Sequence, residues 1–182
     1  MMRWRSSGRR SRLSSFDHLK ESLFEHGTPQ NNTLDMRTHV YLPELVDAFE
    51  WVSAAGPFEN SAYVSRESGR IFWQSETGDL EEELPADVED QTLYACVPHK
   101  RDLDLGQRLV FRFIDETTPD AYDEVRGYFS KRGAYARFKD FLEHRGLLEL
   151  WFSYEQQACE AALREWAHAE DLDVVEGRRA DG

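Results

Sequence analysis

Residues 62–73 read Ala-Tyr-Val-Ser-Arg-Glu-Ser-Gly-Arg-Ile-Phe-Trp. Two runs rich in β-branched and aromatic residues, Ala62 to Ser65 and Arg70 to Trp73, flank four turn residues that end at Gly69. A glycine just before the second run supplies the left-handed residue of a type I turn with a bulge, a common hairpin connection. The stretch therefore predicts a β-hairpin. Leu93 to Pro98 has the composition of a third strand, which Pro98 ends.

Helical patterns surround this hairpin and fill the second half of the chain. Pro43 to Ala55 repeats apolar residues at helical spacing and stops at Gly56. Four further helices are predicted, at residues 105–115, 118–129, 134–145 and 147–169. The last of these carries an apolar stripe expected to face the core, made of Leu148, Phe152, Cys159, Leu163 and Trp166. Because strands come early and helices late, the sequence predicts an α+β fold. We expect a small antiparallel sheet, the hairpin plus one further strand, packed by four or five helices, with a helical C-terminal half.

The ends of these helices carry capping signals. Asp104 and Thr118 are predicted N-terminal caps, because each side chain can accept a hydrogen bond from a first-turn N–H. Gly146 is the predicted C-terminal stop of the helix that begins near Ala134.

The chain of 182 residues suits one domain with extensions. Residues 1–36 are rich in Arg and Ser at their start and are predicted to be a disordered or mis-started basic extension, with a targeting segment as the alternative. A single α+β domain is expected over residues 37–173, followed by a flexible tail at 174–182.

Charge and composition exclude some classes of partner. The net charge is −13, which repels the phosphates of duplex DNA at long range. No apolar run approaches the roughly 20 residues of a membrane span, so we expect a soluble, cytoplasmic protein without a membrane partner. The two cysteines, Cys96 and Cys159, form no disulfide framework and no metal-binding pair.

Several stretches occur together in a recognisable order. They are residues 42–50, 63–71, 112–115, 132–140 (Arg-Gly-Ala-Tyr-Ala-Arg-Phe-Lys-Asp), 151–152 and 165–166. With these the chain resembles the bacterial uncharacterised protein family 158, a domain of unknown function, over Val40 to Trp166. It departs from the family pattern at Pro43 and at Ala136, where the family usually has a second Arg. The resemblance implies a fold grouping and no activity.

Motifs for catalysis or metal binding do not stand out. The six histidines make neither an HExxH motif nor a Cys-His cluster, and no GxSxG nucleophile elbow occurs. The acidic run from Glu76 to Asp90 lacks the spacing of a calcium loop. We therefore predict no catalytic residues, no metal site and no cofactor; this favours a non-enzyme and leaves an enzyme as the alternative.

One group of residues has the chemistry of an anion site. Lys131, Arg132 and Gly133 directly precede the helix predicted from Ala134, and Arg137 follows one turn later. Free N–H groups of a first helical turn, the positive end of the helix dipole and nearby cations together favour a bound anion. The alternative is that these bases pair with carboxylates and only solvate a corner between two helices.

Two classes of function follow. The leading hypothesis is a non-enzymatic, soluble binding or adaptor domain with a phosphate-binding corner at residues 131–137. Its partner could be a protein, a phosphorylated small molecule or single-stranded RNA. The alternative is an enzyme that acts on a phosphorylated small molecule through a site assembled from distant segments. Clustered acids and His99 or His144 beside the corner would favour the enzyme.

Overall fold

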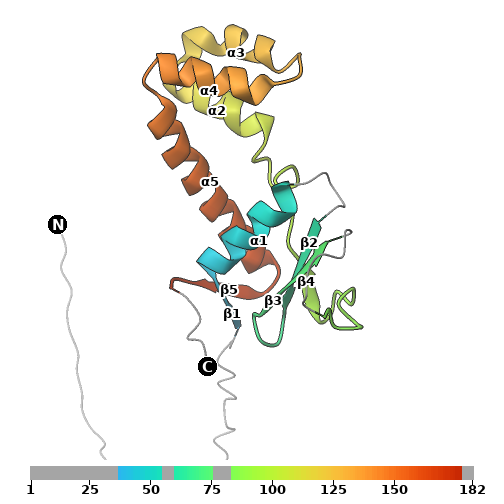
Figure 1. Cartoon of the computed structure of the whole chain (residues 1–182). Coiled ribbons are helices and arrows are strands. Elements are labelled where there is room, and N and C mark those ends of the chain that lie inside the picture. Colours follow the sequence, from blue (N-terminus) through green and yellow to red (C-terminus); the bar gives the residue numbers. More distant parts are fainter. Residues whose placement is uncertain (1–36, 55–59, 76–82, 178–182) are drawn as a thin grey trace, which may run out of the picture. The chain divides into compact units, whose positions relative to one another are not determined.

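The computed structural model describes residues 37–54, 60–75 and 83–177 (Figure 1). Backbone contacts separate Arg37–Gly182 from Met1–Met36 as a unit of its own. The described elements are β1 (Thr38–Tyr41), α1 (Leu42–Ala54), β2 (Asn60–Ser65), β3 (Ile71–Ser75), β4 (Tyr94–Cys96), α2 (Gln107–Thr117), the 3₁₀ helix η1 (Pro119–Ala121), α3 (Tyr122–Tyr128), α4 (Ala134–His144), α5 (Leu148–Ala169) and β5 (Leu172–Val175). The predicted extension at 1–36 and the tail residues 178–182 lie outside the described residues.

The predicted hairpin and third strand form one antiparallel sheet. Strand β2 pairs with β3 on one side and with β4 on the other, giving the order β3-β2-β4. Tyr63 lies opposite Phe72 in β3 and opposite Cys96 in β4. The α+β class and the antiparallel sheet of three strands are therefore confirmed.

A second, parallel pair of strands was not predicted. Strands β1 and β5 pair with Thr38 opposite Leu172 and Tyr41 opposite Val175, so they join the first and last elements of the described domain. Strand β5 continues past Asp173, where the sequence placed the end of the domain. Val174 and Val175, which the sequence assigned to a flexible tail, are thus part of a strand.

The hairpin turn packs closely against β1. Gly69 has φ 69°, as the predicted turn requires, and it is buried. A Cβ atom at this position would lie only 1.9 Å from the carbonyl oxygen of His39. The Thr38 hydroxyl also donates to the carbonyl oxygen of Arg66 in the same turn. The glycine thus allows both the turn conformation and the approach of β1.

Two of the predicted helix caps are wrong. Asp104 has φ 56° and its carboxylate pairs with Arg108 at 2.9 Å, while α2 begins at Gln107 after Gly106 without a side-chain cap. Thr118 makes no side-chain capping bond either, although its carbonyl accepts the first bond of η1 from Ala121. In contrast, Gly146 ends the α4 turn with φ 67°, as predicted.

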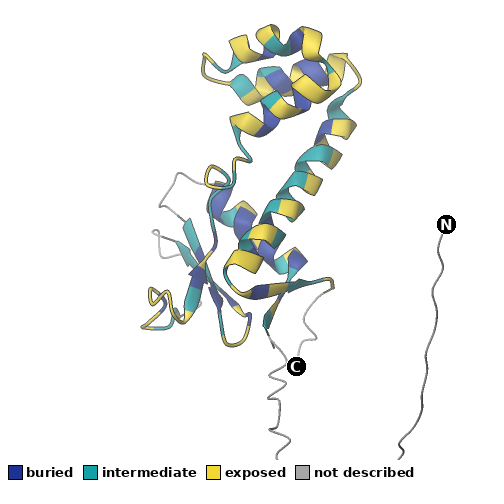
Figure 2. Ribbon diagram, turned by 180° about the vertical axis from the view of Figure 1, so that it is seen from behind, coloured by how far each residue is buried: buried dark blue, intermediate teal, exposed yellow. Residues whose placement is uncertain are grey.

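The described domain has two apolar cores. The first lies between α1, the strands and the C-terminal part of α5; its fully buried members include Val40, Leu45, Ala48, Ala62, Val64, Leu163 and Ala167. The second lies among α2, α3, α4 and the N-terminal part of α5; its fully buried members include Leu109, Phe113, Val125, Phe138, Leu142 and Trp151. Figure 2 shows that α5 runs from one core to the other.

Aromatic rings dominate the helical core. Trp151 lies edge-on to Phe113 and to Phe138, with ring centroids 5.2 and 5.0 Å apart. Such pairs contribute about 0.5–1.5 kcal/mol each beyond the area that they bury. Trp151 is 1% exposed, whereas its neighbour Phe152 is 40% exposed. The apolar stripe predicted for α5 included Phe152, which instead points out of the core.

Candidate functional site

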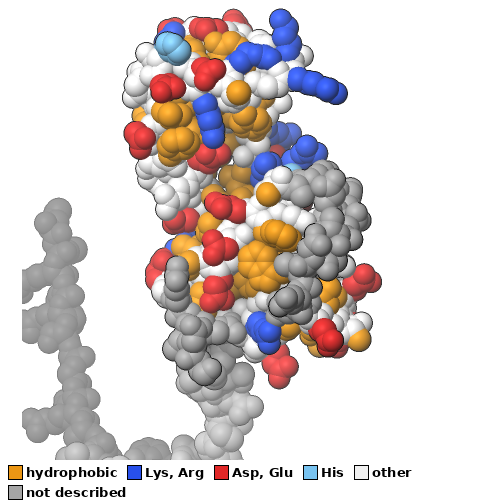
Figure 3. Space-filling view, viewed as in Figure 1, with side chains coloured by type: hydrophobic (Ala, Val, Ile, Leu, Met, Phe, Trp, Pro, Cys, Tyr) orange, Lys and Arg blue, Asp and Glu red, His pale blue; other side chains and the backbone are white. Residues whose placement is uncertain are grey.

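The turn between α3 and α4 carries the residues predicted as an anion site. Gly133 precedes α4 with φ 74° and ψ 26°, in the left-handed conformation that its position in the predicted turn favours. No side chain caps this end of α4, and Lys131 and Arg132 are exposed beside it. Figure 3 shows Lys and Arg side chains gathered where the described helical part carries this turn. The turn thus places two cations next to an uncapped helix start.

Arg137 makes contacts within the same turn. Its guanidinium donates to the carbonyl oxygen of Tyr128 at 3.5 Å and to that of Arg132. A Cβ atom on Gly133 would lie 3.7 Å from the Arg137 Nη2 atom. Tyr128 is the last residue of α3, and its carbonyl oxygen also accepts the Lys131 N–H at 3.2 Å, whereas Arg132 lies in the turn itself. Arg137 therefore connects the end of α3 to the turn, which is a structural role.

A pocket of about 430 Å³ opens between residues of α3 and α4, next to this turn. It is lined by Glu124, Tyr128, Arg137, Asp140, Phe141, His144 and Arg145. The Arg145 guanidinium lies 4.7 Å above the Phe141 ring and 3.6 Å from the carboxylate of Asp120. Of the four residues predicted as an anion site, Arg137 lines this pocket and the other three do not.

The tyrosine of this pocket is held by a carboxylate. The Tyr128 hydroxyl donates to Glu124 at 2.5 Å, and this hydrogen bond is the main reason that the pKa of Tyr128 rises to about 12. The tyrosine therefore stays protonated at neutral pH and acts there as a hydrogen-bond donor.

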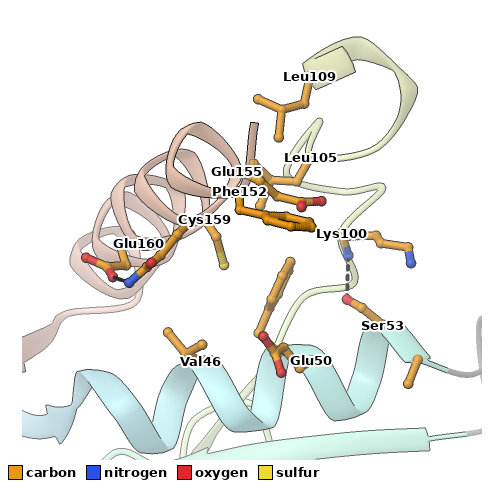
Figure 4. Close-up of a pocket in the computed structure, with 13 residues that line it drawn as sticks. Val46, Glu50, Ser53, Lys100, Leu105, Leu109, Phe152, Glu155, Cys159 and Glu160 are labelled. Carbon is orange, nitrogen blue, oxygen red and sulfur yellow. Dashed lines mark hydrogen bonds between the residues drawn. The ribbon is translucent and has the colours of Figure 1, made fainter. Parts of the chain in front are cut away.

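A larger cleft lies between α1, α5 and the segment at residues 100–109 (Figure 4). Its volume is about 550 Å³, and its lining residues are Val46, Phe49, Glu50, Ser53, Ala54, Lys100, Leu105, Leu109, Phe152, Glu155, Gln156, Cys159 and Glu160. Helices α1 and α5 pack together near the sheets and diverge toward the helical core. The cleft occupies the space where they diverge.

The cleft has an apolar wall that the two cores leave uncovered. Phe152 from α5 extends across the cleft toward the segment that carries Leu105 (Figure 4). Leu105 packs against both cores, so it joins them at the back of the cleft. The backbone N–H of Lys100 donates to the Ser53 hydroxyl at 3.1 Å, which ties this segment to α1. The wall is therefore built from three segments that are far apart in sequence.

Carboxylates from α1 and α5 surround the thiol of this cleft. Burial, together with the negative charges of Glu50, Glu160 and Glu155, raises the pKa of Cys159 to about 11. Figure 4 shows the sulfur of Cys159 pointing toward α1. The thiol is consequently protonated and unreactive near neutral pH.

Glu155 lies one helical turn before Cys159 on α5, in a mixed environment. Burial raises the pKa of Glu155, although Lys139 and Lys100 oppose this shift by attracting the carboxylate. The buried Trp151 indole N–H also favours the charged form, yet it makes no hydrogen bond within the described part of the chain. Glu155 is thus a half-buried carboxylate with more than one available donor nearby.

The sequence did not single out the cleft residues Glu50, Lys100 and Glu155. They lie on α1, on the loop after β4 and on α5, so no local motif contains them. The sequence contains one signal that could have pointed to the cleft. Glu155 and Glu160 lie close in sequence to Phe152 and Cys159, which the helical pattern assigned to an apolar stripe. The sequence pattern predicts Cys159 as a core residue; it packs against the first core and also lines the cleft.

Among residues 37–54, 60–75 and 83–177, no three His, Cys, Asp or Glu side chains cluster in a way that could hold a metal ion. No helix of this described part is both long and apolar enough to cross a membrane. No protein-family model matches the chain, and no curated protein or solved structure matches it. The resemblance to the uncharacterised family 158 therefore stays a prediction.

Proposed function

We propose that this protein is a non-enzymatic binding domain whose ligand site is the cleft between α1 and α5. The observation that carries the proposal is the cleft itself: apolar side chains from three segments, with a few polar groups among them, enclose about 550 Å³. Pockets that bind small molecules have volumes of about 300–1,000 Å³ and this kind of lining. The half-buried Glu155 and Cys159, both with raised pKa values, add the perturbed groups typical of binding sites.

The absence of an activated group favours binding over catalysis. A nucleophilic cysteine needs a lowered pKa, whereas the pKa of Cys159 is raised. No histidine lines the cleft among the described residues, so a general base there would have to be a carboxylate.

The proposal is tested by screening small fragments against ¹⁵N-labelled protein by NMR. We expect bound fragments to shift the amide signals of residues 46–54 and 152–160. The variant Gln156→Trp should block this binding, because Gln156 is exposed and lines the cleft. Gln157→Trp is the matched control, since Gln157 is exposed on the same helix and does not line it. A screen in which no fragment shifts the cleft signals would contradict the proposal.

A second candidate is a phosphate site at the α3–α4 turn, either in a binding protein or in an enzyme for phosphorylated small molecules. One observation favours it, because His144, Asp140 and Glu124 line the same pocket as Arg137 and Arg145. Thermal melts in increasing phosphate, compared with chloride at matched ionic strength, test the site. Arg137→Glu should remove a phosphate-specific rise in Tm, whereas Arg126→Glu, an exposed base outside the pocket, should keep it.

The two explanations of Arg137 make opposite predictions for stability. If its bonds to the carbonyl groups of Tyr128 and Arg132 are its main role, Arg137→Glu lowers the Tm in chloride alone and phosphate has no specific effect. Slow turnover of p-nitrophenyl phosphate that His144→Gln removes would favour the enzyme. Without turnover, a phosphate-specific rise would support binding only.

A further inference from the structure

The charges that line the α1–α5 cleft are mostly negative. Glu50 on α1 and Glu155 and Glu160 on α5 line the cleft, and each of these carboxylates raises the pKa of the Cys159 thiol by its negative charge. Lys100 is the one base in this described lining, and together with Lys139 it acts on Glu155. The lining around Cys159 is therefore negative and lies next to an apolar wall.

The bases near the cleft do not neutralise these carboxylates. In Figure 4 the Lys100 side chain extends away from Glu50 and Phe152. The Lys139 ammonium lies 5.5 Å above the Phe152 ring and outside the cleft lining. Neither lysine forms an ion pair with a cleft carboxylate among the described residues.

Glu50 is the carboxylate best placed to take a new partner. It is exposed, and no described side chain donates a hydrogen bond to it or forms an ion pair with it. Glu160 by contrast already accepts a hydrogen bond from Gln156 at 2.9 Å. A cation that enters between α1 and α5 would thus meet Glu50, which has no partner among the described residues, and a second carboxylate, Glu160, in the same lining.

We propose that the cleft binds a small molecule that carries a protonated amine on an apolar body. The amine would donate charge-assisted hydrogen bonds to Glu50 and Glu160, which are the stronger kind of hydrogen bond. The apolar body would lie along Phe49, Phe152 and Leu105, where burial from water stabilises it. The same carboxylates repel an anionic ligand of equal shape. This inference rests on the proposed function, because it assigns a chemical class to the ligand of that site.

Three probes of nearly equal shape test the ligand class: 3-phenylpropylamine, 3-phenyl-1-propanol and 3-phenylpropionate. They are titrated into ¹⁵N-labelled protein at pH 7, and the amide shifts of residues 46–54 and 152–160 are followed. We expect the amine to bind about fivefold more tightly than the alcohol, and the acid to bind most weakly. In 0.5 M NaCl the advantage of the amine should shrink, because salt screens exposed charges.

Variants then assign the effect to the carboxylate. Glu50→Gln should remove most of the preference of the amine over the alcohol. Asp47→Asn is the matched control, because Asp47 is exposed on the same helix and does not line the cleft. It should preserve the preference. Equal loss in both variants would show a general effect of net charge and would overturn the assignment.

The outcomes separate the two proposals. If the alcohol or the acid binds in the cleft at least as tightly as the amine, the ligand class is wrong and the binding function stands. The same holds if other fragments bind in the cleft and the amine does not. If no fragment and no probe shifts the cleft signals, the proposed function fails as well.

Discussion

Arg66 in the hairpin turn pairs with Glu170 at the C-terminal end of α5, 104 positions later in the chain. Its guanidinium donates to the Glu170 carbonyl oxygen at 2.5 Å and to the Glu170 carboxylate, and it also donates to the Gln91 carbonyl oxygen at 3.0 Å. One side chain thus joins the antiparallel sheet, the loop before β4 and the negative end of the α5 dipole.

Removing this side chain should destabilise the domain. Arg66→Ala leaves partly buried acceptors without a donor, so we expect the free energy of unfolding to fall by about 1–3 kcal/mol. Arg108→Ala is the control, because its i,i+4 pair with Asp104 is exposed and should contribute less than about 0.5 kcal/mol. Urea unfolding of both variants provides the comparison. Equal losses of unfolding free energy in the two variants would show that the pairing of Arg66 with Glu170 stabilises the domain no more than an exposed ion pair does.

Two glycines with the same backbone conformation should respond differently to alanine. Gly69 and Gly146 both have φ near +70°, at 69° and 67°, so each variant carries the strain of about 1 kcal/mol that this conformation imposes on an L-residue. A Cβ on Gly69 also collides with the His39 carbonyl, whereas a Cβ on Gly146 meets nothing within 4 Å.

Gly69→Ala should therefore cost at least about 2 kcal/mol more than Gly146→Ala, because β1 must move away from the turn. Chemical denaturation measures the difference. If the two variants are equally stable, β1 does not pack on the turn as the structure shows.

The thiol of Cys159 should be alkylated slowly, and the rate should keep rising with pH without reaching a plateau. In a Cys96→Ser variant, alkylation by iodoacetamide should speed up about tenfold per pH unit from pH 8 to pH 10, because a pKa of about 11 keeps the thiolate fraction small throughout. Adding Glu50→Gln removes one of the charges that raise this pKa and should accelerate the reaction. A rate that levels off below pH 9 would be inconsistent with the environment described for this thiol.

Stability should depend on pH through Glu155. Its pKa is raised in the folded protein, chiefly by burial, so the folded state holds the proton more tightly than the unfolded state. The contribution of this group to stability is therefore fully present at low pH and is lost as pH rises through its folded pKa. Glu155→Gln should increase the free energy of unfolding relative to the natural protein at pH 7, and this gain should disappear toward pH 4.

The matched control for this experiment is Glu165→Gln, which removes the same charge from an exposed position of α5. Unfolding at several pH values compares the two variants. A gain from Glu155→Gln that is constant with pH, or equal in the control, would argue against a buried carboxylate at this position.

Local signals in the sequence predicted the elements that depend on neighbouring residues. The alternation of residues 62–73 predicted the hairpin, and Gly69, Gly133 and Gly146 all have the positive φ expected of a turn or helix end. Helical spacing located the five helices to within a few residues. These features follow from backbone sterics and from hydrogen bonds within one or two turns, which a short window of sequence contains.

Capping was predicted less well because side chains at helix ends have competing partners. Asp104 was predicted to cap α2, but its carboxylate pairs with Arg108 instead. The backbone of Asp104 is itself left-handed, and the helix begins later, at Gln107. Arg137 was predicted to reach toward a bound anion, and it instead makes hydrogen bonds to carbonyl groups of its own turn. Short-range competition of this kind depends on side-chain geometry that the sequence does not specify.

Only the tertiary structure decided the pairing of β1 with β5 and the existence of the cleft. The two strands have four residues each and lie at opposite ends of the described sequence. Neither strand therefore carries a sequence pattern that identifies its partner. The cleft exists because α1 and α5 pack at one end and diverge at the other, which brings Glu50, Lys100 and Glu155 around one cavity. Contacts between residues that far apart depend on how whole elements pack against two cores, and no local property of the chain encodes them.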